Sequence, residues 1–166
     1  MIEAGLLFSV ALYRIVMAFF DLPAQIRPIH VSHDEKPAKD ADRIADQKRF
    51  AAFVTKSPSG FFLLGPGLTC SIRIATGRPL VCDCFLDVAP EAAEDFLAHM
   101  STARPIFGFA CMPGERERRN RVITKQGSNK IESWVGRDTQ KYVPGLYWLT
   151  LLPDALARQH DVPLAA

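Results

Sequence analysis

Three short apolar segments separated by tight turns place the strongest constraint on the fold. Residues 61–88 read FFLLGPGLTCSIRIATGRPLVCDCFLDV, and the GPG and TGRP stretches have the residues that turns require. After the first turn, Ser71 and Arg73 alternate with apolar neighbours, as expected for a strand with one covered face, and Asp83 does the same after the second turn. The segment therefore predicts three neighbouring strands of an antiparallel sheet.

The rest of the chain alternates further short strands with amphipathic helices. The expected strands lie near residues 29–31, 105–112, 131–135 and 146–152. The expected helices cover residues 40–55 with Asp40 or Asp42 as the N-cap, residues 90–100 from Pro90, a short charged segment after Pro113, and a last helix from Pro153. This order predicts an α+β fold, with a mainly antiparallel sheet and several flanking helices. A chain of 166 residues suits one compact domain over residues 1–166, and its end at PLAA, without a closing element, also allows a C-terminal truncation.

An apolar stretch at the N-terminus, AGLLFSVALYRIVMAFF over residues 4–20, has two interpretations. It is slightly short for a helix that spans a bilayer, Arg14 lies near its middle, and no signal-peptide pattern surrounds it. We therefore expect a helix of a water-soluble fold, and a membrane-associated helix is the weaker alternative. The apolar positions fit one helical stripe that consists of Leu6, Leu7, Val10, Tyr13, Met17 and Phe20.

The run YVPGLYWLTLLP, residues 142–153, is also almost continuously apolar. Pro144 and Gly145 predict a turn, after which residues 146–152 are expected to form a strand covered on both faces. Trp148 and Leu149 would then lie in the core on opposite sides of this strand. The preceding turn, residues 137–143, is the part that remains accessible to a partner.

No sequence motif points to catalysis. The chain has no phosphate-binding loop, no dinucleotide-binding glycine pattern and no G-x-S-x-G motif. His30 and His33 form an H-x-x-H pair followed by Asp34 and Glu35, which on a helix would suit a metal ion. Prolines on both sides disfavour a helix, so we expect exposed histidines, no catalytic residues, no metal and no cofactor.

The four cysteines, Cys70, Cys82, Cys84 and Cys111, contain no C-x-x-C pair. Strand alternation points Cys82 and Cys84 to the same side. We expect reduced, buried thiols rather than a zinc site. Reduced cysteines and the missing secretory signal indicate a cytoplasmic protein.

The run ERERRNR, residues 115–121, places four arginines beside two glutamates. Arginine forks bind phosphates or carboxylates, so nucleic acid and an acidic protein surface are both candidate ligands. The glutamates offset the positive field, the net charge is only +2, and no aromatic residue is interleaved. We therefore expect a solvated helix with internal ion pairs or a protein contact patch, and no nucleic-acid partner.

Three segments of the second half resemble a known class of proteins. PIFGFACMPGERERRNRV, NKIESWVGRDTQKYVPGLYWLTLLPDALA and QHDVPL are similar to immunity proteins of bacterial polymorphic-toxin and type VI secretion systems, in the type VI immunity family or the immunity 52 family. The resemblance covers about residues 80–166, and its most specific element is the G-R-D…Y-x-P-G-L-Y-W-L run.

This resemblance implies a non-enzymatic protein that binds a cognate toxin and neutralises it by direct contact. Tight inhibitors bind through aromatic and arginine side chains near the centre of the interface. The candidate partner-binding residues are Arg116, Arg118, Arg119, Arg121, Trp134, Arg137, Asp138 and Tyr142. A metal-dependent enzyme that uses His30 and His33, and a nucleic-acid-binding module that uses residues 116–121, are the alternatives. An open sheet edge would also allow a homodimer.

Overall fold

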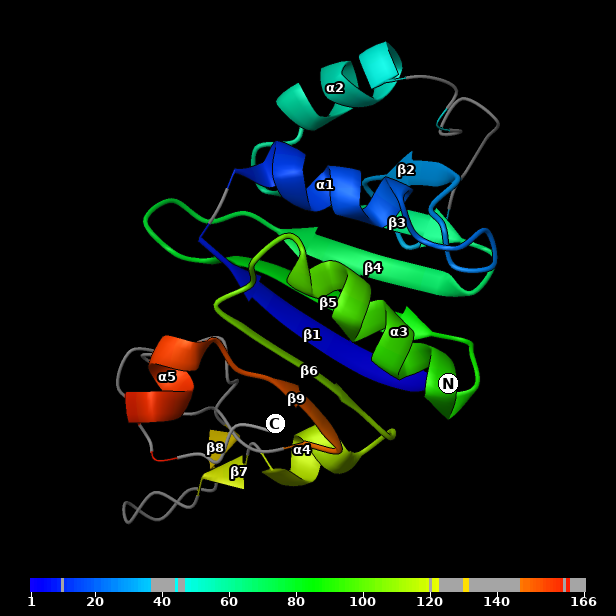
Figure 1. The fold of residues 1–166 in the computed structure, drawn as a ribbon. Helices are drawn as coiled ribbons and strands as arrows, with labels where there is room; N and C mark the ends of the chain where they lie inside the picture. Colours follow the sequence, from blue (N-terminus) through cyan, green and yellow to red (C-terminus); the bar gives the residue numbers. More distant parts are fainter. Residues whose placement is uncertain are drawn as a thin grey trace.

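The protein folds around one large antiparallel sheet. The computed structural model describes residues 1–9, 11–36, 44, 47–119, 121–122, 130–131, 147–159 and 161. Within these ranges the sheet has seven strands in the order β2-β3-β4-β5-β1-β6-β9 (Figure 1). Its strands are β1 (Ile2–Phe8), β2 (His30–Ser32), β3 (Gly60–Gly65), β4 (Leu68–Arg73), β5 (Leu80–Leu86), β6 (Phe107–Cys111) and β9 (Leu149–Leu151). The α+β fold with a mainly antiparallel sheet is confirmed.

The three-strand segment that constrains the fold forms β3, β4 and β5 as neighbouring antiparallel strands. Phe62 faces Ser71 between β3 and β4, and Ser71 faces Asp83 between β4 and β5. Side chains that share a row lie on the same face of a sheet. The alternation in the sequence therefore places Cys70, Cys82 and Cys84 on one face and Ser71, Arg73 and Asp83 on the other.

The N-terminal apolar stretch is not the single helix that its sequence predicts. Residues 2–8 form β1, which pairs with both β5 and β6, and only α1 (Leu12–Phe20) is helical. A central strand is buried on both faces, so its apolar run lacks the alternation that would distinguish it from a buried helix. The expected stripe is wrong within α1 as well, because Tyr13 is 69% exposed and the buried positions include Ile15 and Phe19. No helix in the described ranges is both long and apolar enough to cross a membrane.

Helices α1 and α3 (Pro90–Ser101) lie over one face of the sheet, which we call the helix face (Figure 1). The core beneath them includes Ile2, Leu6 and Phe8 of β1. Two side chains join the helices. Nε2 of His99 donates to the Ala18 carbonyl oxygen at 2.9 Å, a contact that requires the proton on this nitrogen, and Nη2 of Arg14 donates to the Thr102 carbonyl oxygen at 3.2 Å.

The third helix, α2 (Gln47–Thr55), lies near the β3 end of the sheet. Its Phe50 and Phe53 rings make edge contacts with Phe61 at centroid distances of 6.1 and 6.0 Å. The predicted helix begins at residue 40, whereas α2 begins at Gln47, and both expected N-cap residues, Asp40 and Asp42, lie outside the described residues. The helices predicted from Pro90 and Pro153 are confirmed, the latter as α5 (Asp154–Gln159).

The C-terminal apolar run contributes less to the core than its sequence predicts. Strand β9 has three residues, all half-buried, and it pairs with β6 alone within the described part of the sheet. Trp148 precedes the strand and is 43% exposed, so the expectation that it lies in the core is wrong. The physical reason is position, because a terminal strand has a neighbour on one side. Of the strand expected at residues 131–135, the structure describes Ile131 in β8 (Lys130–Ile131), which pairs with β7 (Arg121–Val122).

Candidate binding surface

The second face of the sheet, opposite α1 and α3, carries the candidate site, and we call it the open face. Toward β6 it has an apolar cluster formed by Leu7, Val81, Phe107, Phe109, Cys111 and Tyr147. Toward β3 it presents polar and aromatic side chains around a hollow of about 430 Å³. The residues that line this hollow are Glu35, Phe62, Thr69, Ser71, Arg73, Asp83, Phe85 and Arg116.

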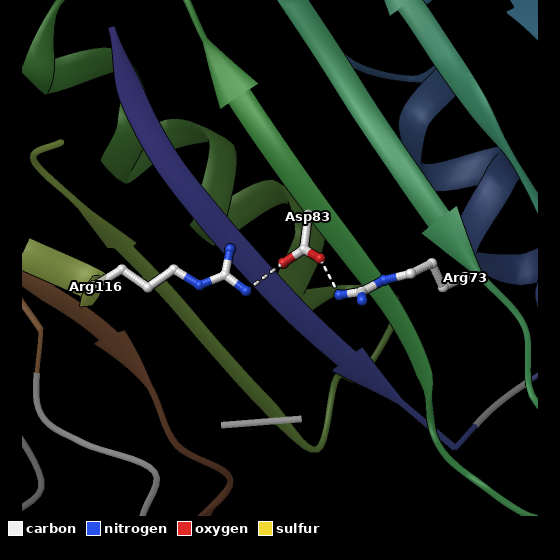
Figure 2. Close-up of polar contacts among 3 residues, drawn as sticks. All are labelled: Arg73, Asp83 and Arg116. Atoms are coloured by element: carbon white, nitrogen blue, oxygen red, sulfur yellow. Dashed lines mark hydrogen bonds and ion pairs between the residues drawn. The ribbon is translucent and has the colours of Figure 1, made fainter. Parts of the chain in front are cut away.

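An aspartate between two arginines lines the hollow. Figure 2 shows the guanidinium groups of Arg73 and Arg116 approaching Asp83 from opposite sides. Nη2 of Arg73 donates to Oδ2 of Asp83, while Nη2 of Arg116 lies 2.8 Å from Oδ1. The second contact is an ion pair that lacks the alignment of a hydrogen bond, because buried Oδ1 has no aligned donor. Two cations therefore compensate one largely buried carboxylate.

The three charged side chains differ in how much solvent they contact. The exposed fraction is 14% for the Asp83 side chain, 23% for Arg116 and 52% for Arg73. Ion pairs that are shielded from water are stronger than exposed ones, since water screens charges. The Asp83–Arg116 pair therefore supports the fold, and Arg73 is the cation of this group that is accessible to a ligand.

Strand register explains how the group assembles. Arg73 of β4 faces Val81 of β5, so Asp83 is its diagonal neighbour on the open face. On the other side, Asp83 faces Gly5 of β1, and Gly5 in turn faces Phe109 of β6. Gly5 has no side chain, which leaves room for a long side chain to cross β1 and reach the carboxylate.

Arg116 makes that crossing from α4 (Glu115–Arg119), the short charged helix that the sequence predicts. Its Cζ atom lies 5.7 Å from the centroid of the Phe109 ring, within the range of a cation–π contact. The Phe109 ring also stacks on Tyr147 at 4.2 Å. The Phe109 ring thus supports the Arg116 side chain on its way to Asp83. The stacking of Tyr147 on the same ring holds the segment before β9 against the open face.

Two phenylalanines give the hollow an apolar side. Phe85 of β5 is 45% exposed, and Phe62 of β3 is half-buried. A large apolar side chain in a middle strand is usually covered. Its exposure beside a charged group is typical of interface centres, where aromatic and arginine side chains occur together.

The structure brings one of the predicted partner-binding residues, Arg116, into the hollow. Arg118 is exposed, and its Nε donates within α4 to the Gly114 carbonyl oxygen at 3.3 Å. Arg119 and Arg121 lie in α4 and β7, where the backbone alone is described. The other four predicted residues lie outside the described residues; they are Trp134, Arg137, Asp138 and Tyr142.

Sequence reasoning missed Arg73, Phe62 and Phe85 as site residues, and it noted Asp83 only for its place in an alternating strand. The available signal was that alternation, which puts a carboxylate between two buried cysteines and a guanidinium at the end of the preceding strand. Alternation assigns a face but does not show which residues of different strands meet.

The described residues around His30 and His33 are not arranged as a metal-binding site. His30 lies in β2, and His33 follows that strand and stacks on Phe53 at 4.7 Å. Within the described ranges, no group of three or more histidine, cysteine or acidic side chains is arranged to hold a metal ion.

All four cysteines are free and buried, as the sequence predicts. Burial raises the pKa of Cys70, and hydrogen bonding to Cys82 and Cys84 raises it further. Burial also raises the pKa of Cys84. It raises the pKa of Cys111 to about 12, with the negative charge of Glu3 as a second cause. The thiols of Cys70, Cys84 and Cys111 therefore stay protonated at neutral pH and act as small apolar side chains.

In comparisons with known proteins, no family model, curated protein or solved structure matches the chain.

Proposed function

We propose that this protein is a non-enzymatic immunity protein that binds a cognate bacterial toxin and neutralises it by direct contact. The observation that carries the proposal is the open face, where an exposed aromatic side chain adjoins an accessible arginine held by a buried carboxylate. The resemblance of about residues 80–166 to immunity proteins supports the same assignment.

The chemistry of the open face favours a protein ligand. The hollow is shallow and lies on a sheet, and it combines Phe62 and Phe85 with the charged side chains of Arg73 and Asp83. Protein interfaces bind through such a mixture because the aromatic groups contribute buried area and the charged pairs fix the orientation.

Co-expression with the toxin tests the proposal. The toxin reading frame next to this gene is expressed from an inducible promoter, with and without the protein, in a host that lacks both genes. We expect growth to be restored and the two chains to co-elute in size-exclusion chromatography. Continued toxicity without a complex would contradict the proposed function. A chain with its sequence order scrambled is the control for expression load.

A further inference from the structure

We propose that the toxin inserts a carboxylate side chain, with an aromatic or aliphatic side chain next to it, into the hollow on the open face, and that Arg73 binds the carboxylate. This inference rests on the proposed function and names the chemistry that the hollow recognises. It also places the main contact on β3, β4 and β5, whereas the sequence points to the C-terminal half.

Arg73 is prepared to accept a second anion. A guanidinium group has five N–H donors in a rigid fork, and Asp83 is its partner within the described part of the chain. The side chain remains 52% exposed, so donors that face the solvent are accessible to a ligand. Because Asp83 already restrains the guanidinium group, a ligand carboxylate would bind with a smaller loss of side-chain entropy.

The exposed guanidinium of Arg73 favours a carboxylate ligand in the hollow. Arg73 and Arg116 both contact the carboxylate of Asp83, and Arg73 is the more exposed of the two, with 52% of its side chain accessible compared with 23%. Glu35 also lines the hollow but is exposed and forms no ion pair within the described ranges. Glu35 therefore repels acidic groups of a ligand. A ligand carboxylate binds only if its attraction to Arg73 is stronger than its repulsion by Glu35.

The aromatic side chains select what accompanies the acid. Phe85 is 45% exposed on the same face as Arg73, and Phe62 lies one row from it on β3. Covering these rings requires an apolar group within one side-chain length of the carboxylate. A segment of the toxin with an acidic residue beside an aromatic or aliphatic residue meets both requirements, and a purely acidic ligand does not.

Affinity measurements with matched variants test the site. The dissociation constant of the toxin complex is measured by calorimetry for the wild type, Arg73→Gln and Phe85→Ala. The controls, Lys56→Gln just after α2 and Tyr13→Ala on α1, make similar changes at exposed positions. We expect each site variant to raise the constant about 10- to 100-fold and each control to change it less than about threefold. Glu35→Gln should lower the constant, because it removes the repulsion at the rim.

The outcomes separate this inference from the proposed function. If the wild type forms no complex, both fail. If the wild type binds, and Arg73→Gln, Phe85→Ala and Glu35→Gln all bind like the controls, the hollow is not the contact and this inference alone fails. Circular dichroism of each variant checks the fold, and Glu35→Gln, at an exposed position, keeps the test valid if Phe85→Ala unfolds.

A double-mutant cycle identifies the ligand group. Each exposed acidic residue of the toxin is replaced by its amide and paired with Arg73→Gln. We expect one acid whose replacement weakens binding to the wild type at least about fivefold but leaves binding to Arg73→Gln nearly unchanged. Additive effects for every acid would overturn the assignment of a carboxylate.

Discussion

At the residue scale, Asp83 links the stability of the sheet to its binding surface. It lies in the middle strands with 14% of its side chain exposed and has an arginine on each side. A carboxylate at such a position is stable only with charged partners, because burial removes its hydration. The same residue therefore stabilises Arg116 against the sheet and orients Arg73 toward the solvent.

Replacement of this carboxylate gives the first prediction. Asp83→Ala should lower the free energy of unfolding by about 1–3 kcal/mol, because it removes the ion pair between this carboxylate and the largely buried guanidinium of Arg116. Asp87→Ala, at an exposed acid just after β5, should change it by less than about 0.5 kcal/mol. Urea unfolding followed by tryptophan fluorescence measures both, and equal losses would show that the ion pair adds no stability.

The buried thiols give a prediction on pH. The pKa of Cys111 is raised from 9.0 to about 12, so the folded protein keeps this proton at a pH where the unfolded chain has lost it. The resulting stability is complete below about pH 9 and is lost as the pH rises toward about 12. The free energy of unfolding should therefore fall across this range, by at most about 1.4 kcal/mol per pH unit for each such thiol. Urea unfolding at several alkaline pH values measures the slope, which should be smaller for Cys111→Ala. An unchanged slope would contradict the assignment.

At the scale of elements, the turn into β3 depends on a glycine that no other residue can replace. Gly60 has a φ of +130°, and a Cβ atom there would lie 2.1 Å from the Ile72 carbonyl oxygen. Gly77, in the turn between β4 and β5, also has a positive φ of +71°, but a Cβ atom there would meet nothing within 4 Å. The two glycines share a conformational requirement and differ in their surroundings.

This pair makes a controlled comparison. Gly60→Ala should disrupt the β3–β4 pairing and lower the free energy of unfolding by more than about 3 kcal/mol, since the backbone must move to relieve the overlap. Gly77→Ala should cost about 1 kcal/mol, the strain of the positive φ alone. Thermal unfolding of the two variants side by side measures the difference. A loss for Gly60→Ala no greater than that for Gly77→Ala would refute this account of the turn.

Helices and strands with one buried face and one exposed face are predictable from the sequence, because their apolar residues recur at a regular period. Those buried on both faces are not. Strands β4 and β5 and helix α3 show clear periods, and each was located within one or two residues. Strand β1 is buried on both faces, so its sequence has no strand period that separates it from α1. The contact of Arg116 with Asp83 was not predictable because it joins residues 33 positions apart and requires Gly5 between them.

At the scale of the whole molecule, the two faces of the sheet have different roles. The helix face is covered by α1 and α3 over an apolar core (Figure 1). The open face combines buried aromatic rings near β6 with accessible charged and aromatic groups near β4 and β5. The C-terminal segment stabilises this arrangement, because Tyr147 stacks on Phe109 and Arg116 lies over the same ring.

Hydroxyl-radical footprinting of the toxin complex tests the central claim most directly. Phe85 on the open face is 45% exposed and Tyr13 on α1 is 69% exposed, so both rings are oxidised in the free protein. We expect complex formation to protect Phe85 and to leave the oxidation of Tyr13 unchanged. Protection of Tyr13 with unchanged oxidation of Phe85 would place the toxin on the helix side and contradict the account.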